Sequence, residues 1–370
     1  MFVMVACRLA VYFGSMIWPI PNENLVPISP LNGQGYFDFL FYLDSLEQYR
    51  TESLGDILEK FITFYQRPFE AQFGHIIAGP IFPAIIGLFN YHPENTLPLS
   101  VAFLVLDCLW AGLWIKWAAN RKYPTIALIG FAVAPNPIWF MLVLSPDLIF
   151  AFLVGVFYLS YFRKSQTRKS TLIWIMTLIT VLMTRPNGYS ILIFVLLDIF
   201  WSNYRSGGYK IWRLAFLTVL SLLFAVYLYP YFITEMRKTA VDHIFFGLRA
   251  SEYAEGIFPM LPGWIDFVLS WLTLIVVKIL NFVGLRPSYG ATQEALVFIR
   301  AISGVVLLPG LIWGIIRAGT RHRMFLLIFF LPIFLGPSQD RYNLPVFPLL
   351  FFFGIAFYQY YWNKLINRDN

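Results

Sequence analysis

Long runs of apolar residues, separated by short polar turns, occupy most of the chain. A membrane-spanning helix needs roughly 20 apolar residues, because it must cross the hydrocarbon core of the bilayer. The runs interpreted here as membrane segments are 2–20, 99–119, 124–140, 147–163, 170–186, 188–203, 211–230, 263–283, 294–316, 324–337 and 343–362. They predict an all-α, polytopic transmembrane protein with about ten to twelve membrane segments. None has the alternating pattern of a membrane β-barrel strand.

The composition and the charge pattern agree with this class. Hydrophobic residues make up 59% of the 370 residues and charged residues 13%, whereas a soluble domain carries about 25% charged residues. The net charge of +7 comes from basic residues in short loops, chiefly "RKSQTRK" (163–169) and "RAGTRHR" (317–323). Basic loops favour the cytoplasmic side of a membrane. We therefore expect a membrane lipid environment and no nucleic-acid partner.

Counting segments outward from the basic loops gives the topology. We expect one integral-membrane domain over residues 1–370, with two long non-spanning stretches at 21–75 and 231–262. The first of these, 21–75, is predicted to be the first external loop. No Ala-x-Ala-like cleavage site follows the segment 2–20, so we interpret it as a retained helix.

Two parts of the outer face are predicted to be helical without crossing the membrane. Residues 75–91 form a short apolar stretch with Pro80 and Pro83, which favours a re-entrant or interfacial helix. Residues 53–65 carry apolar side chains at helical spacing. This pattern fits an amphipathic helix in the membrane interface or a packing helix in a folded loop, and both interpretations stay open.

Acidic residues on the outer face are the first candidates for chemistry. Asp38 and Asp44 lie in "GYFDFLFYLDSL", six residues apart, so a helix would not put both on one face. Asp147 follows Pro146 at the expected start of a helix, where the dipole favours a negative charge. Ordinary capping and solvated loop acids are the alternative interpretations.

Basic and polar residues on the same face form a second set. Arg185 and Asn187 interrupt an apolar run in "LMTRPNGYS". An arginine in or near the membrane costs about 3 kcal/mol or more unless it is paired, and guanidinium binds phosphate oxygens well. The remaining candidates for substrate contacts are Arg67, His75, His243, Asp340, Arg341 and Tyr342. No residue spacing indicates a metal site.

These pieces resemble, in their order along the chain, the GT-C superfamily of integral-membrane glycosyltransferases. The resemblance rests on Asp38 and Tyr42 after the first helix, followed by the segments "GPIFPAIIGLF", "SPDLIF", "TRPNG" and "DRYNLPVFP". The branches it resembles most are bacterial relatives of the protein O-mannosyltransferases, the aminoarabinose lipid A transferases and the GPI mannosyltransferases. The first acid stands in "FDF" rather than in the "DE" or "WDG" of relatives, which leaves the branch and a divalent-metal requirement open.

The resemblance implies transfer of a sugar from a polyprenyl-phosphate donor to a glycan, lipid or protein acceptor, with inversion. The reaction would occur on the non-cytoplasmic face of a bacterial inner membrane. Asp38 would be the general base, with Asp44 as the nearby alternative and Asp147 as the second acidic position. Arg185, Arg341 and Tyr342 would contact the donor phosphate, and no cofactor is indicated.

Two other functions remain open at this point. A flippase or exporter of polyprenyl-linked glycans would carry internal repeats and charges at the membrane midplane, and no repeat is visible in the sequence. An O-antigen polymerase or ligase would carry a large external loop late in the chain, and the stretch 231–262 keeps that alternative available.

Overall fold

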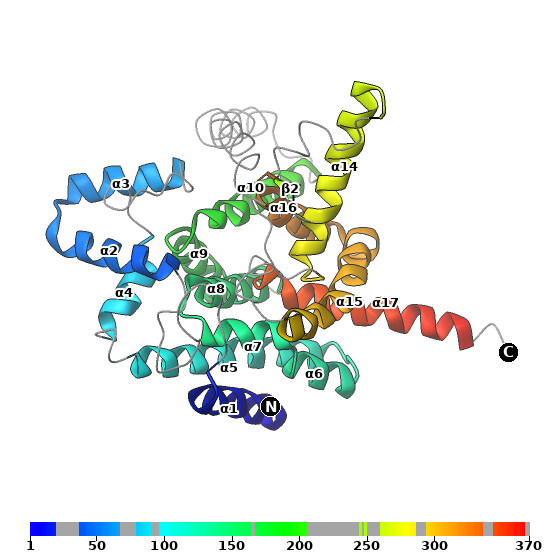
Figure 1. The fold of residues 1–370 in the computed structure, drawn as a ribbon, viewed down its shortest axis with the longest axis horizontal. Helices are drawn as coiled ribbons and strands as arrows, with labels where there is room; N and C mark the ends of the chain where they lie inside the picture. The colour runs from blue at the N-terminus through cyan, green and yellow to red at the C-terminus, as the bar shows by residue number, and fades with distance from the viewer. Residues whose placement is uncertain are drawn as a thin grey trace.

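The structure is a computed structural model that describes residues 1–19, 37–66, 79–89, 96–163, 167–205, 244–245, 248–249, 260–285, 294–335 and 343–366. Within these ranges the chain is helical, apart from one antiparallel pair of two-residue strands (Figure 1). The elements are α1 (Phe2–Ile17), α2 (Phe37–Thr51), α3 (Leu54–Gln66), α4 (Ile81–Leu88), α5 (Leu97–Asn120), α6 (Thr125–Ala132), α7 (Pro135–Leu142), α8 (Pro146–Tyr161), α9 (Arg168–Leu182), the 3₁₀ helix η1 (Pro186–Gly188), α10 (Tyr189–Arg205), β1 (Ile244–Phe245), β2 (Leu248–Arg249), α14 (Gly263–Phe282), α15 (Glu294–Arg317), α16 (Thr320–Leu335) and α17 (Phe347–Ile366).

The helices occupy the apolar runs, so the prediction of an all-α fold is confirmed at this level. One run is divided: the predicted segment 124–140 forms two helices, α6 and α7, with a break at Ala134. Ala134 is extended, with ψ of 124°. The cause is Pro135, because the ring of a proline disfavours the α conformation in the residue before it. The predicted segment 211–230 lies outside the described residues.

Three stretches are long and apolar enough to cross a membrane among the described residues: Leu97–Asn120, Thr125–Leu142 and Gly263–Phe282. Four further apolar helical stretches are shorter: Phe2–Ile17, Pro146–Tyr161, Tyr189–Ser202 within α10 and Ala301–Arg317 within α15. A helix of 16 residues is only about 24 Å long, less than the hydrocarbon thickness of about 30 Å. Membrane association is therefore supported, and the count of ten to twelve spans stays a prediction.

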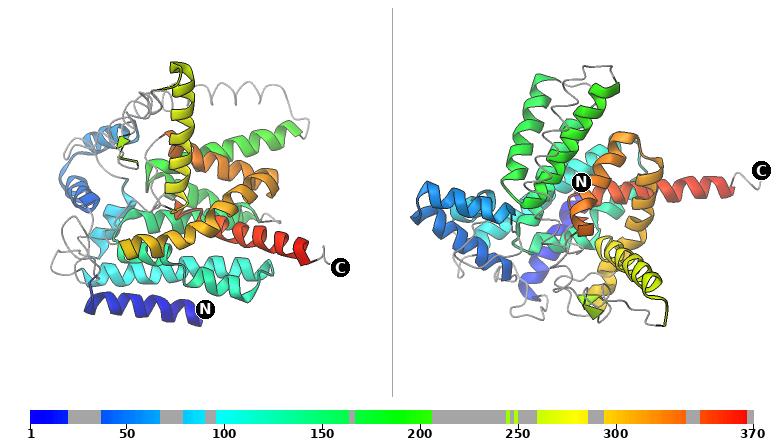
Figure 2. Two further views of the ribbon diagram at one scale, coloured as in Figure 1. Left: turned by 45° about the vertical axis from the view of Figure 1, so that its right-hand side comes forward. Right: turned by 90° about the horizontal axis from the view of Figure 1, so that it is seen from above.

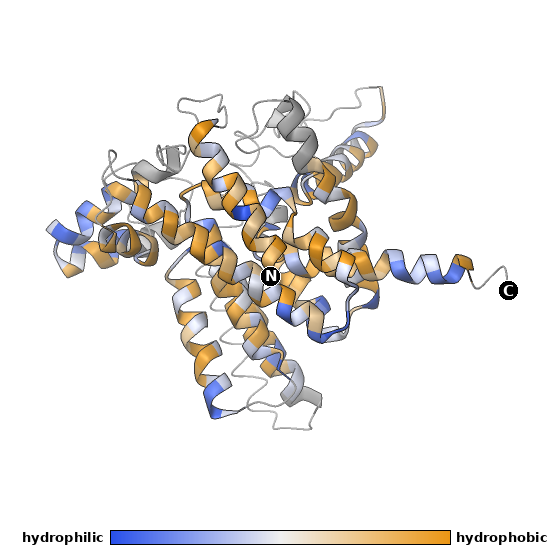
Figure 3. Ribbon diagram, turned by 90° about the horizontal axis from the view of Figure 1, so that it is seen from below, coloured by the Kyte–Doolittle hydropathy of each residue, from blue (hydrophilic) through white to orange (hydrophobic). Residues whose placement is uncertain are grey.

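Apolar side chains cover much of the outer surface of the helices. In Figure 3 orange dominates along the helices, and blue gathers at turns and helix ends. Large exposed hydrophobic side chains include Phe2 on α1, Leu109 on α5 and Leu172 on α9. Such a surface is unfavourable in water and is expected of helices that face lipid.

Close helix packing holds the C-terminal half together. Gly310 of α15 lies directly on α17, because a Cβ at this position would sit 1.8 Å from the carbonyl oxygen of Leu350. Gly354 of α17 meets Val306 of α15 in the same way, at 2.1 Å. Small residues let membrane helices approach closely where no hydrophobic force joins them. The two glycines therefore set the contact between α15 and α17.

Helix α8 connects two ends of the bundle that differ in chemistry. Asp147 stands in its first turn and Tyr161 is its last residue, a separation of about 21 Å along a helix. Helix α9 packs against α8 and follows it in the chain. Because Arg185, just beyond the end of α9, pairs with Asp147, α9 runs back toward the start of α8. We call the end at Asp147 the motif end, and the end with the turn residues 121–124, 162–163, 167 and 318–319 the basic end.

Candidate functional site at the motif end

An ion pair joins the two central polar motifs at the motif end. Arg185 Nη1 donates a hydrogen bond to Asp147 Oδ1. The side chain of Asp147 is 4% exposed and that of Arg185 is 14% exposed. The "SPDLIF" and "TRPNG" segments, predicted to share a face of the membrane, are thus in direct contact.

The local sequence fixes the position of Asp147. Ser145 is extended and caps α8: its Oγ accepts a hydrogen bond from the Asp147 backbone N–H at 3.4 Å. The same Oγ donates to Asp147 Oδ2 at 3.0 Å. Pro146 occupies the first turn, where its missing N–H costs nothing. Each carboxylate oxygen therefore has a partner, and the acid is held rigidly rather than solvated.

A tight turn presents Arg185. Helix α9 ends at Leu182, η1 follows at Pro186–Gly188, and the Gly188 N–H bonds the Arg185 carbonyl oxygen at 2.9 Å. A Cβ on Gly188 would lie 2.7 Å from the Val181 carbonyl oxygen. Only glycine fits this close approach, so the "PNG" sequence shapes the turn that carries the arginine.

The "GPIF" motif packs on the same turn. A Cβ on Gly79 would lie 2.4 Å from the carbonyl oxygen of Met183 and 3.0 Å from that of Thr184. Gly79 immediately precedes Pro80 and helix α4, the eight-residue helix inside the stretch 75–91. The backbone just before Arg185 is therefore covered by Gly79, two residues ahead of α4.

Helix α2 extends this assembly. Tyr42 of α2 is buried and packs edge-on against Phe82 of α4, with ring centroids 4.8 Å apart. Ser45 and Gln48 of α2 are also buried. Asp38 precedes Tyr42 by four residues and Ser45 by seven, so it stands on the same helix face. This is the face that α2 turns toward α4.

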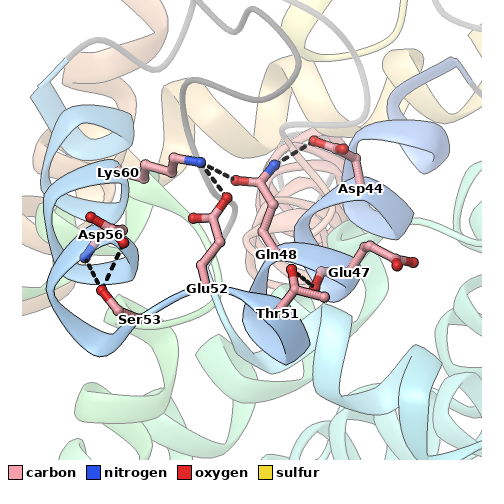
Figure 4. Close-up of polar contacts among 8 residues, drawn as sticks. All are labelled: Asp44, Glu47, Gln48, Thr51, Glu52, Ser53, Asp56 and Lys60. Atoms are coloured by element: carbon pink, nitrogen blue, oxygen red, sulfur yellow. Dashed lines mark hydrogen bonds and ion pairs between the residues drawn. The ribbon is translucent and has the colours of Figure 1, made fainter.

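Asp44 lies on another flank of α2 and belongs to a polar chain between α2 and α3 (Figure 4). Gln48 Nε2 donates to Asp44 Oδ2 at 2.5 Å. Lys60 Nζ of α3 donates to Gln48 Oε1 at 3.1 Å and to Glu52 Oε1 at 2.5 Å. These contacts give Asp44 a structural role in joining α2 to α3. The side chain of Asp38 lies outside the described set.

The other predicted site residues divide into two groups. Asn187 lies in η1, partly buried, two residues after Arg185. The residues outside the described ranges are Arg67, His75, His243, Asp340, Arg341 and Tyr342. Asn343, which follows them, is fully buried and donates through Nδ2 to the Phe282 carbonyl oxygen at 2.6 Å. This bond fixes Asn343, the first described residue of the last motif, to the end of α14.

A buried ion pair that the sequence analysis did not identify lies between α1 and α5. Arg8 Nε bonds Asp107 Oδ2, and both side chains are fully buried. Arg8 Nη1 also donates to the Ala132 carbonyl oxygen of α6 at 2.7 Å. The signal was present in the sequence, because a charge inside an apolar run needs an opposite charge or a carbonyl partner in the membrane. Figure 2 shows α1 lying alongside α5.

A second cluster lies at the basic end. Arg321 donates to both carboxylate oxygens of Asp198 on α10, at 2.5 Å to 3.0 Å, and Tyr161 donates to the same carboxylate at 2.8 Å. His322 shares a 2.8 Å hydrogen bond with the hydroxyl of Tyr158. Burial, with Arg121 and Arg321 nearby, lowers the pKa of His322 to about 4. Its imidazole is therefore neutral near pH 7.

The described residues contain no group of three or more His, Cys, Asp or Glu side chains placed to hold a metal ion. Comparisons of the chain with protein-family models, with curated protein sequences and with solved structures found no match in any of the three. A functional assignment therefore has to be argued from the residues at the motif end and their contacts.

Proposed function

We propose that this chain is an integral-membrane glycosyltransferase of the GT-C type. In this proposal it moves a sugar from a polyprenyl-phosphate donor to a hydroxyl on a glycan, lipid or protein acceptor. The chain would be polytopic and lie in a bacterial inner membrane. The reaction would take place at the motif end, on the non-cytoplasmic face.

One observation carries the proposal: four motif segments that are far apart in sequence form a continuous chain of contacts. Tyr42 packs on Phe82, Gly79 packs on the backbone of Met183 and Thr184, and Arg185 pairs with Asp147. Each segment was selected from the sequence for its polar residues or for its resemblance to GT-C motifs, and not for its packing. Their convergence supports a shared site, because unrelated surface turns have no reason to meet.

In the proposed reaction the acceptor hydroxyl oxygen attacks the anomeric carbon of the donor sugar. A new glycosidic C–O bond forms, and the bond from that carbon to the lipid phosphate oxygen breaks. Asp38 takes the hydroxyl proton as general base, because a hydroxyl is a poor nucleophile until it loses its proton. The bonding electron pair leaves with the phosphate oxygen, so the released lipid phosphate, the second product, carries one more negative charge than the phosphodiester donor.

Arg185 is the proposed contact for the departing phosphate. A fixed guanidinium in a site of low dielectric stabilises developing negative charge without reorganising during the reaction. Asp147 and Ser145 would serve as positioning groups: the carboxylate orients Arg185, and the serine hydroxyl orients the carboxylate. In this scheme Asp147 does not itself accept the proton.

The test is transfer by the purified full chain in detergent or nanodiscs, with synthetic polyprenyl-phosphate sugars as donors and mass spectrometry as the readout. The donor panel is set by comparing envelope glycans of cells with and without the gene. We expect a sugar to be lost from those glycans and transferred in vitro, and Arg185→Lys to retain more transfer than Arg185→Ala. Unaltered glycans, together with no transfer from any donor, contradict the proposal.

One observation favours a second candidate function, export of polyprenyl-linked glycans. Arg8 and Asp107 stand near the middle of α1 and α5, and a buried charge pair at mid-membrane is typical of transporters. Proteoliposomes separate the two functions. A transferase converts the donor to free lipid phosphate, whereas an exporter moves the intact lipid-linked glycan across the bilayer.

A further inference from the structure

Several turns converge at the basic end. The turn between α15 and α16 lies on the end of α8, because Arg321 stands over the rings of Tyr161 and Phe162, 5.2 Å and 5.5 Å from their centroids. His322 stacks on Phe162 with centroids 4.5 Å apart. Arg317, at the end of α15, lies 5.4 Å from the ring centroid of Tyr360 on α17.

The charge at this end is strongly one-sided. Besides Arg321, the exposed cations on these turns and within two residues of them are Arg121, Lys122, Arg163, Arg168, Lys169 and Arg317. Among the described residues, none of these six forms an ion pair with an acid. Within the described ranges, the acid at this end is Asp198, which Arg321 already neutralises; the side chain of Asp198 is only 7% exposed. An excess of positive charge is left facing outward.

Aromatic rings lie among these cations. The guanidinium of Arg121 sits 4.5 Å from the ring centroid of Trp117, and that of Arg317 sits 5.6 Å from Trp313. Tyr360, Tyr361 and Trp362 of α17 are exposed nearby. Tryptophan and tyrosine prefer the headgroup level of a bilayer, where one part of the ring is apolar and another is wet.

We infer that the basic end is a binding surface for anionic phospholipid headgroups, which the six exposed cations and the rings of Trp117, Trp313 and Tyr360 hold at the membrane interface. The cations are spread over separate turns instead of converging on one point. This spacing suits a layer of lipid phosphates better than a single soluble anion. The inference does not depend on the proposed transferase reaction, because it uses none of the residues at the motif end.

The surface can be tested on the full chain reconstituted in vesicles, with spin-labelled phosphatidylglycerol and phosphatidylcholine as probes. The measured quantity is the association constant of phosphatidylglycerol relative to phosphatidylcholine. Each cation near an anionic surface contributes a factor of about five in binding. Changing Arg121 and Arg317 together to glutamine should therefore lower the preference by about 25-fold.

Two controls separate charge from folding. Arg121→Lys with Arg317→Lys keeps the charge, so we expect most of the preference to remain. Arg50→Gln removes an exposed arginine from α2, distant from the basic end, and should leave the preference unchanged. An unchanged preference in the double glutamine variant overturns the inference. Displacement of the labelled lipid by millimolar inorganic phosphate at constant ionic strength also overturns it, because that result indicates a site for a soluble anion.

Discussion

Arg8 of α1 and Asp107 of α5, separated by 99 residues in sequence, form an ion pair in which neither side chain is exposed. Arg8 Nη2 and Asp107 Oδ1 have no hydrogen-bond partner among the described residues. Both charges are therefore buried, and each side chain keeps one polar atom without a hydrogen bond. It fastens α1, whose outer face carries exposed apolar side chains, to α5 and α6.

Breaking this pair from one side should be more harmful than removing it. Arg8→Leu leaves Asp107 buried and unpaired, at a cost of about 3–5 kcal/mol, whereas a pair of apolar residues in its place is often tolerated. We expect Arg8→Leu and Asp107→Leu each to lower the unfolding midpoint in detergent strongly. The double variant should recover most of the loss, and equal losses in all three variants would contradict this account.

Because α15 and α17 are in close contact, replacing a glycine by alanine should change stability differently inside and outside that contact. Gly310→Ala places a Cβ against the Leu350 carbonyl oxygen and should destabilise the protein by about 1–3 kcal/mol through overpacking. Gly14→Ala in α1 is the control, because no atom lies within 4 Å of its added Cβ. That change should stabilise the helix by about 0.5–1 kcal/mol. Thermal unfolding in detergent measures both, and similar midpoints for the two variants would contradict the prediction.

The lowered pKa of His322 should make the stability of the folded protein depend on pH. Its pKa in the folded protein is about 4, below its ordinary value near 6.5, so between these values the unfolded chain binds the extra proton. Stability is therefore lost as the pH falls from about 6.5 to about 4. Partial exposure screens the effect, which should be on the order of 1–2 kcal/mol.

The variant His322→Asn isolates this contribution from that of other titrating groups. The difference in unfolding free energy between wild type and variant should shrink as the pH falls through that window. A difference that stays constant from pH 7 to pH 4 would show that His322 does not titrate as described.

Replacing Ser145 should lower both the stability of the protein and its sugar-transfer activity. Ser145→Ala removes the cap of α8, at about 1 kcal/mol, and the hydrogen bond that holds Asp147. We expect sugar transfer to fall with it. Ser53→Ala is the matched control, because Ser53 makes the same two contacts with Asp56 in α3. It should cost similar stability and leave transfer unchanged; equal transfer by both variants would exclude a positioning role for Ser145.

Much of the helical layout could be predicted because long apolar runs leave few alternatives to a helix in a membrane. The break at Ala134 was also encoded, in Pro135, but the length of the run concealed it. Contacts between distant segments could not be predicted. The local sequence does not indicate that Gly79 contacts the backbone of Met183, or that Arg8 pairs with Asp107 rather than with another acid. The packing of whole helices decides both contacts.

The two acids of α2 illustrate the same limit. Spacing alone indicated that Asp38 and Asp44 lie on different faces of a helix, and both fall within α2. Which face turns toward the other motifs became clear only from the buried side chains of Tyr42 and Ser45. The hydrogen bond from Gln48 then gave Asp44 a separate, structural role.

The most direct measurement is the rate of sugar transfer by Asp38→Asn and Asp44→Asn, purified side by side and checked for equal folding. Loss of a general base lowers the rate by about 10²–10⁴-fold. We predict a loss of that size for Asp38→Asn and a change within a few-fold for Asp44→Asn. Wild-type transfer by Asp38→Asn, or an equal loss in both variants, would contradict the assignment of Asp38 as the base.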